Sequence, residues 1–170
     1  MTTNNDLEFM SQAVEVAKEA RLRSSPNPWV GAVVVSEGKI ISTAATGSHG
    51  ELHAEAQALF EAGEKARGAT LYTTLEPCSH QGLTGPCTEA IMSSEISRVV
   101  IAIKDPDEKV SGSGIDTLLE AGIEVELGPG APEVLEQLAS YLHHRNTGFP
   151  YVVLKLAATL DGRIDAPDGT

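Results

Sequence analysis

Three short segments of this 170-residue chain carry side chains that could bind a metal ion and activate water. They are His53-Ala54-Glu55, Pro77-Cys78 and Pro86-Cys87. One histidine and two cysteines supply three borderline-to-soft donors, a set that favours zinc over magnesium or calcium. Three protein ligands leave one coordination position open, which is typical of a catalytic zinc site and not of a structural one. The pattern predicts that His53, Cys78 and Cys87 bind Zn²⁺.

Glu55 lies two residues after His53, so its carboxylate could reach a water molecule beside the metal and not the metal itself. Zinc lowers the pKa of water towards neutrality, and a nearby carboxylate can take the proton and pass it to a leaving amine. We therefore expect Glu55 to be the catalytic acid and base. Cys87 follows Pro86 at an expected helix start, where exposed N–H groups and the helix dipole favour a thiolate.

Hydrophobic spacing and turn residues predict the elements that must position these side chains. Helices are expected over residues 7–23, 53–67, 86–96, 115–120 and 131–145. Strands are expected over residues 30–36, 39–45, 70–75, 98–104 and 123–127. Strands and helices alternate after the first hairpin, which predicts a three-layer α/β/α domain with a mixed, mostly parallel central sheet.

The last part of the chain does not follow this alternation. Pro150-Tyr151-Val152-Val153-Leu154-Lys155-Leu156 has the composition of a strand, but the residues that follow are turn-like. The sequence therefore predicts that one zinc-dependent unit covers residues 1–147. Residues 148–170 are expected to be a linker and the first strand of a second unit that is otherwise absent.

Composition limits the classes of partner. An apolar fraction of 41% and a charged fraction of 21% indicate a globular domain, and the formal net charge of -12 disfavours nucleic acid. The first residues lack the pattern of a signal peptide, and no apolar run is long enough to cross a membrane. Two cysteines in such a chain indicate metal binding or chemistry more than a disulfide. We expect a cytoplasmic protein with a small-molecule substrate, without nucleic-acid or membrane partners.

Longer motifs around the three segments resemble one family. These motifs are Ser25-Pro26-Asn27-Pro28-Trp29-Val30-Gly31-Ala32-Val33, His53-Ala54-Glu55, Ala66-Arg67-Gly68-Ala69-Thr70-Leu71-Tyr72, Leu75-Glu76-Pro77-Cys78-Ser79-His80 and Gly85-Pro86-Cys87. Residues 7–145 resemble the deaminase domain of the bifunctional riboflavin-biosynthesis deaminase/reductase, within the cytidine-deaminase-like superfamily. The eight residues between the cysteines match that family's own spacing. Residues 152–164 resemble the opening of its reductase domain.

The resemblance implies hydrolytic deamination of 2,5-diamino-6-ribosylamino-4-pyrimidinone 5′-phosphate at C2, with Zn²⁺ as cofactor and an oligomeric assembly. It also implies that Asn27 and Glu55 hold the pyrimidine edge and that His80 lines the same pocket. His49 and Asp107 are implied as further substrate-binding residues. From local sequence alone, Asn27 between two prolines would be an ordinary turn residue, and His80 an exposed loop histidine.

Three features depart from the family's usual pattern. Leu83 stands where a lysine or arginine is usual, and the loop over residues 47–52 is shorter than usual. Asp107 replaces an asparagine, and its charge would repel a phosphate unless Lys104 or Lys109 pairs with it. Two alternatives therefore stay open: a related zinc deaminase that acts on a different amino-pyrimidine or purine-like molecule, and a non-catalytic scaffold that zinc stabilises. Intact Glu55 argues against the scaffold.

Overall fold

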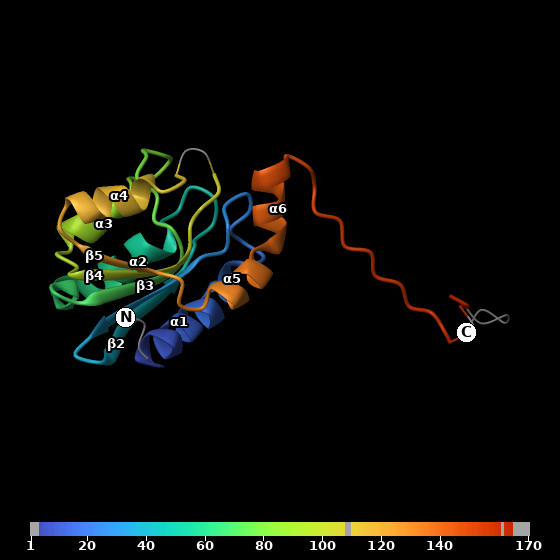
Figure 1. The fold of residues 1–170 in the computed structure, drawn as a ribbon, viewed down its shortest axis with the longest axis horizontal. Coiled ribbons are helices and arrows are strands. Elements are labelled where there is room, and N and C mark those ends of the chain that lie inside the picture. The colour runs from blue at the N-terminus through green and yellow to red at the C-terminus, as the bar shows by residue number, and fades with distance from the viewer. Residues whose placement is uncertain (1–3, 108–109, 161, 165–170) are drawn as a thin grey trace.

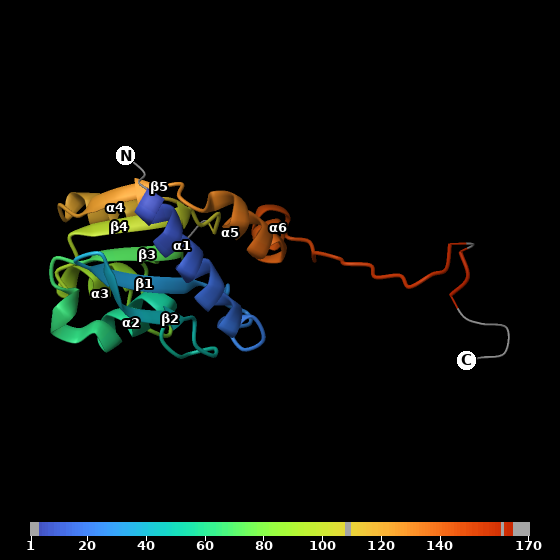
Figure 2. The same ribbon diagram turned by 90° about the horizontal axis from the view of Figure 1, so that it is seen from below.

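The computed structural model describes residues 4–107, 110–160 and 162–164. A five-stranded sheet lies between two layers of helices (Figures 1 and 2). The strands follow the spatial order β2-β1-β3-β4-β5; they are β1 (Gly31–Ser36), β2 (Lys39–Ala45), β3 (Thr70–Leu75), β4 (Arg98–Ile103) and β5 (Glu124–Leu127). The three-layer α/β fold expected from the sequence is confirmed.

The sheet is mixed, as predicted, but it is not mostly parallel. Strand β1 pairs antiparallel with both β2 and β3, whereas β3–β4 and β4–β5 are parallel. Among the described pairings the two kinds are therefore equal in number. The reason is that β1 and β2 form a hairpin, and β1 inserts beside β3 in the opposite direction. Only the connections through a helix produce parallel neighbours.

The described part of the chain contains six α-helices. They are α1 (Asn4–Ala17), α2 (Ala54–Ala62), α3 (Cys87–Ser93), α4 (Ser113–Glu120), α5 (Ala131–Gln137) and α6 (Ala139–Thr147). Helices α1 and α5 lie on one face, and α2, α3 and α4 lie on the other (Figure 1). Helix α1 lies so close to β1 that a Cβ on Gly31 would be 2.0 Å from the carbonyl oxygen of Ala13.

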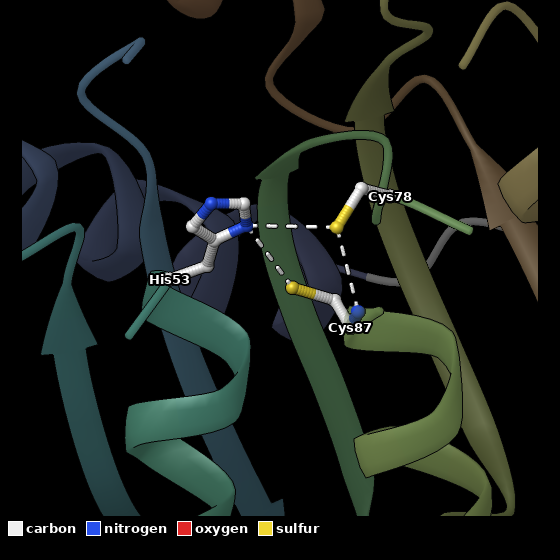
Figure 3. Close-up of side chains that lie close together, drawn as sticks. All are labelled: His53, Cys78 and Cys87. Carbon is white, nitrogen blue, oxygen red and sulfur yellow. Dashed lines mark hydrogen bonds between the residues drawn. The ribbon is translucent and has the colours of Figure 1, made fainter. Parts of the chain in front are cut away.

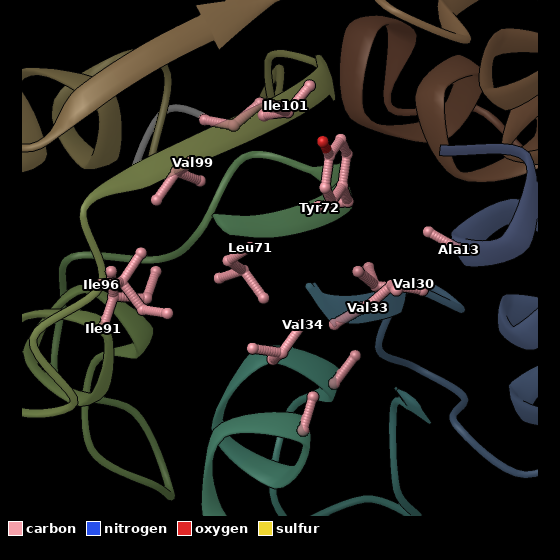
Figure 4. Packing of buried hydrophobic residues seen from close by; sticks show 14 of the residues in the cluster. Ala13, Val30, Val33, Val34, Leu71, Tyr72, Ile91, Ile96, Val99 and Ile101 are labelled. Carbon is pink, nitrogen blue, oxygen red and sulfur yellow. The ribbon is translucent and has the colours of Figure 1, made fainter. Parts of the chain in front are cut away.

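The core extends over both faces of the central strands (Figure 4). Val33 and Val34 are neighbours in β1 and point to opposite faces, yet both are fully buried. This explains the continuous apolar runs of β1 and β4, because helices cover both sides of the sheet. Leu71 in β3 is also fully buried, and its replacement by alanine would cost about 2–5 kcal/mol of stability.

None of the predicted helices has the expected boundaries at both ends, and three differ most. The helix expected over residues 53–67 ends at Ala62 and continues as a 3₁₀ turn over Gly63–Ala66. The helix expected over residues 7–23 ends at Ala17 and continues only as a 3₁₀ turn over Lys18–Ala20. The helix expected over residues 131–145 is divided into α5 and α6 at Leu138. Leu138 is fully buried, and its backbone (φ -95°, ψ 14°) departs from helical values. This break sets α6 at an angle to α5 (Figure 1).

The strand predicted at residues 150–156 is wrong. These residues have no regular secondary structure, and they extend away from the body of the protein (Figures 1 and 2). The side chains are exposed, Val152 by 81% and Leu154 by 78%. A β-rich segment needs a neighbouring strand to satisfy its backbone, and none lies beside it in the described chain. None of the described helices has the length and apolar character needed to cross a membrane.

Candidate zinc site

The three predicted ligands lie at the carboxyl-end edge of β3, where its following loop meets the starts of two helices. His53 immediately precedes α2 in an extended conformation (φ -69°, ψ 160°), and Cys87 is the first residue of α3. Cys78 lies in the loop after β3, where its carbonyl oxygen accepts a hydrogen bond from the Thr88 N–H at 3.2 Å. Ligands commonly bind at this end of parallel strands.

The start of the loop that carries Cys78 packs against α4. A Cβ on Gly114 would lie 2.0 Å from the carbonyl oxygen of Pro77, so only glycine allows this approach. Glu76 is buried, and its carboxylate accepts hydrogen bonds from four backbone N–H groups. Two are in the segment that joins β4 to α4 (Asp105 and Gly112), and two are in the first turn of α4 (Gly114 and Ile115). The Cys78 loop and this segment are thereby fixed to each other.

The three ligand atoms converge on one point (Figure 3). His53 Nδ1 lies 3.6 Å from Cys78 Sγ and 3.4 Å from Cys87 Sγ, and all three atoms lie within 4.8 Å of one another. Two donors at zinc's usual bond lengths and a tetrahedral angle are about 3.5 Å apart. Both distances from the histidine nitrogen to the cysteine sulfurs therefore fit a shared zinc ion.

The protonation of the three side chains is coupled. Hydrogen bonding from the Cys87 thiol lowers the pKa of Cys78 to about 4, and the same interaction, with burial, raises the pKa of Cys87. The hydrogen bond with Cys78 raises the pKa of His53. A divalent cation would replace the protons that these side chains share and would satisfy all three donors at once.

Glu55, the second residue of α2, is only 4% exposed and lines the cavity beside this cluster. Burial raises the pKa of its carboxyl group to about 7. A carboxyl group with a pKa near 7 can both accept and return a proton at neutral pH. The catalytic role of Glu55 stays a prediction.

Two adjoining cavities open beside the metal cluster. The main cavity has a volume of about 230 Å³ and reaches from His53, Glu55 and Cys78 to Tyr141 and Arg145. The side cavity has a volume of about 150 Å³. Both are lined by the same four residues where they meet: Asn27, His53, Cys78 and His80. A small molecule in either cavity would lie against the metal ligands.

Comparison with known proteins assigns this arrangement to a family. The sequence profile described as the cytidine and deoxycytidylate deaminase zinc-binding region matches residues 3–103. The chain belongs to this deaminase family. Its zinc-binding character and the His/Cys/Cys cluster together identify the cation of the site as zinc.

Closer similarity is to riboflavin-biosynthesis proteins. The chain is 48% identical to riboflavin biosynthesis protein RibD of Bacillus amyloliquefaciens over 161 residues, which are 95% of this chain and 43% of that protein. The structure of Acinetobacter baumannii RibD (form 1) is 44% identical with a TM-score of 0.90, over 94% of this chain and 45% of that one.

A third similar structure is a Thermotoga maritima diaminohydroxyphosphoribosylaminopyrimidine deaminase/5-amino-6-(5-phosphoribosylamino)uracil reductase. It is 43% identical with a TM-score of 0.91, over 97% of this chain and 48% of that one. The deaminase chain described here thus spans less than half the length of these relatives.

The structure places the predicted substrate-binding residues of this deaminase along the two cavities. Asn27 and His80 line both, Asp107 lines the main cavity and His49 lines the side cavity. Leu83, the apolar replacement, also lines the side cavity and is 73% exposed. The short loop before α2 therefore still brings a histidine to the site.

Sequence reasoning missed the contribution of α6. Tyr141 and Arg145 line the main cavity, and Arg145 Nη1 lies 3.4 Å from Asp107 Oδ2. The compensating charge beside Asp107 was expected from Lys104 or Lys109; Lys109 lies outside the described residues. The sequence predicted a helix through Arg145, but it contained no signal for where that helix docks.

Proposed function

We propose that this chain catalyses the hydrolytic deamination of 2,5-diamino-6-ribosylamino-4-pyrimidinone 5′-phosphate in riboflavin biosynthesis. The observation that carries the proposal is the main cavity, in which a buried carboxylate, Glu55, lies beside a three-donor zinc cluster. The similarity to RibD proteins at 43–48% identity supports the choice of substrate. Zinc in such a site supplies activated water near neutral pH.

The residues of the chain would have separate tasks. Glu55 accepts a proton from the reacting water and passes it to the amino group that leaves as ammonia. The side-chain amide of Asn27 offers a donor and an acceptor to the edge of the pyrimidine ring. His80, beside Asn27 in both cavities, would complete the wall around the ring. Burial of Glu55 excludes water from competing for its proton.

The test is ammonia release from the phosphorylated diaminopyrimidinone by the zinc-loaded chain, with cytidine and guanine as comparison substrates. Turnover of the pyrimidinone alone would support the proposal. Turnover of cytidine or guanine in its place would favour the second candidate, a related deaminase of another amino-heterocycle. Exposed Leu83 in the side cavity is the observation that favours this candidate. Zinc-loaded, folded protein that released no ammonia from any of them would contradict both.

We also infer that residues 1–147 form the deaminase domain and that residues 148–170 are a linker and the opening segment of a reductase-like domain. Helix α6 ends at Thr147, and the side chains of residues 149, 151–154 and 156 are exposed beyond it. Limited proteolysis should cut first between residues 149 and 156 and leave the zinc-bound part intact. Early cleavage within residues 1–147 would contradict this division. An oligomeric state and a cytoplasmic location stay predictions.

A further inference from the structure

The cavities beside the zinc cluster contain mostly acidic or neutral side chains. Four carboxyl groups line the main cavity, those of Glu55, Glu76, Asp105 and Asp107. Among the described residues that line either cavity, Arg145 is the only lysine or arginine. An anionic group of a substrate therefore has one guanidinium to bind in the described site.

Arg145 is held by contacts to two different elements. Its Nη1 lies 3.4 Å from Asp107 Oδ2 in the segment after β4, and its guanidinium carbon lies 5.3 Å from the ring centroid of Tyr141. The Tyr141 hydroxyl lies 2.9 and 3.0 Å from the two carboxylate oxygens of Asp105, to which it donates. Asp105, Tyr141 and Asp107 thus orient the guanidinium before any substrate arrives.

The guanidinium retains capacity for a second anion. Arginine carries five N–H donors in a planar fork, and the shortest contact to Asp107, through Nη1 at 3.4 Å, does not require all five. The Arg145 side chain is 37% exposed, so a ligand in the cavity can reach it. A phosphate monoester matches the fork with two parallel hydrogen bonds.

The opposite end of the site offers a phosphate no guanidinium or ammonium group among its described residues. The described lining of the side cavity around Leu83 contains histidines and Glu51 but no lysine or arginine. An apolar side chain at this position offers nothing to a phosphate. The charge distribution therefore directs an anionic substituent away from Leu83 and towards α6.

We propose that Arg145 is the specificity-determining residue that binds the 5′-phosphate of the substrate, and that Asp107 orients it while weakening phosphate affinity. This inference rests on the proposed function, since it assigns the phosphate of that substrate. The pair has opposite roles: the guanidinium attracts the phosphate, and the Asp107 carboxylate competes with it.

The test compares kcat/KM for the phosphorylated pyrimidinone and for its dephosphorylated ribosyl form, and uses their ratio as the phosphate preference. In Arg145→Met the preference should fall about 10–100-fold, the range for loss of a charge-assisted hydrogen bond, and Arg145→Lys should restore part of it. In Asp107→Asn the preference should rise about 2–5-fold. Arg67→Met is the matched control, because Arg67 pairs with Glu95 outside both cavities, and it should leave the preference unchanged.

A purely structural Arg145–Asp107 pair would give a different result. Both variants would then lower kcat/KM for the two substrates equally and in the same direction, and the preference would stay at the wild-type value. That outcome would overturn the proposal. An unchanged preference in Arg145→Met with normal turnover would overturn it as well.

A binding measurement separates this proposal from the proposed function. Ribose 5-phosphate and ribose are titrated calorimetrically into the zinc-loaded wild type and Arg145→Met. Binding of ribose 5-phosphate that weakens about tenfold or more in the variant would support the phosphate site even if no pyrimidinone were deaminated. Deamination by a wild type whose ribose 5-phosphate affinity does not depend on Arg145 would retain the function and refute this inference.

Discussion

Two groups of charged side chains lie at opposite ends of β4, and they use burial differently. The amino-end cluster consists of Asp6, Tyr72, Arg98 and Glu126. Arg98 contacts Asp6 through two nitrogens, at 2.8 and 3.3 Å, and Glu126 at 2.6 Å, and the Tyr72 hydroxyl donates to Asp6 at 2.8 Å. At the other end, Glu55 is almost as buried as Asp6, but it faces a cavity and two thiols.

The difference shows why one cluster stabilises the fold and the other can perform chemistry. In the amino-end cluster each buried charge meets an opposite charge or a hydrogen-bond donor, so ionised forms are stabilised and α1, β3, β4 and β5 are tied together. At the site, burial raises the pKa of Glu55 to about 7, although the charge of nearby His53 acts in the opposite direction. Such a group costs stability and gains reactivity.

The largest expected effect is that of Glu55→Gln on turnover. The amide cannot transfer the proton, so ammonia release should fall about 10²–10⁴-fold. Zinc content and melting temperature should stay at or above the wild-type values, since a buried ionisable group is replaced by a neutral one. Zinc analysis, thermal unfolding and the ammonia assay check these outcomes. Normal turnover by the variant would show that Glu55 is not the catalytic base.

Arg98→Met should have the reverse effect, with a loss of stability and little effect on chemistry per folded molecule. It leaves Asp6, which is 2% exposed, without its cation, and the cost should be about 3–5 kcal/mol in the free energy of unfolding. The exposed Arg67–Glu95 pair supplies a control, because Arg67→Met should cost at most about 1 kcal/mol. Urea unfolding measures both. Equal losses would mean that the amino-end cluster is no stronger than a surface pair.

Gly114→Ala tests how the site is held in place. The added Cβ would meet the Pro77 carbonyl oxygen at 2.0 Å, which must displace the Cys78 loop or α4. We expect a loss of about 1–3 kcal/mol of stability together with weaker zinc retention against a chelator. Gly85→Ala is the control, since no atom lies within 4 Å of its added Cβ. Unchanged zinc retention in Gly114→Ala would show that this contact does not position Cys78.

The smallest expected effect is on the free energy of unfolding at alkaline pH, through Tyr72 in the amino-end cluster. Burial and the Asp6 hydrogen bond raise the pKa of Tyr72 from 10.0 to about 12. As pH rises above 10 the unfolded chain therefore loses this proton before the native protein does, and the free energy of unfolding declines until about pH 12. In Tyr72→Phe the decline between pH 9 and 11 should be shallower, as urea midpoints would show. If the free energy of unfolding declined equally with pH in the wild type and in Tyr72→Phe, the pKa of Tyr72 would not be raised in the native protein.

Much of the site could be predicted because its signals are local. His53, Glu55, Cys78 and Cys87 stand in short motifs, and a buried strand or a helix start lies next to each of them. The order of strands and helices also followed from hydrophobic spacing, and β2 and β3 occupy the residues expected. These features depend on neighbours in sequence, so the residue types alone specify them.

The sequence by itself therefore determined the zinc chemistry, the three-layer fold and the boundaries of the five strands to within one residue. Only the tertiary structure decided that β1 inserts antiparallel beside β3, that residues 150–156 form no strand, and that burial of Leu138 turns α6 away from α5. It also decided that Arg145 meets Asp107, 38 positions away, at the cavity. The physical reason is that strand pairing and charge pairing between distant segments depend on how the helices pack against the sheet. The spacing of apolar and polar residues within one segment does not indicate that packing.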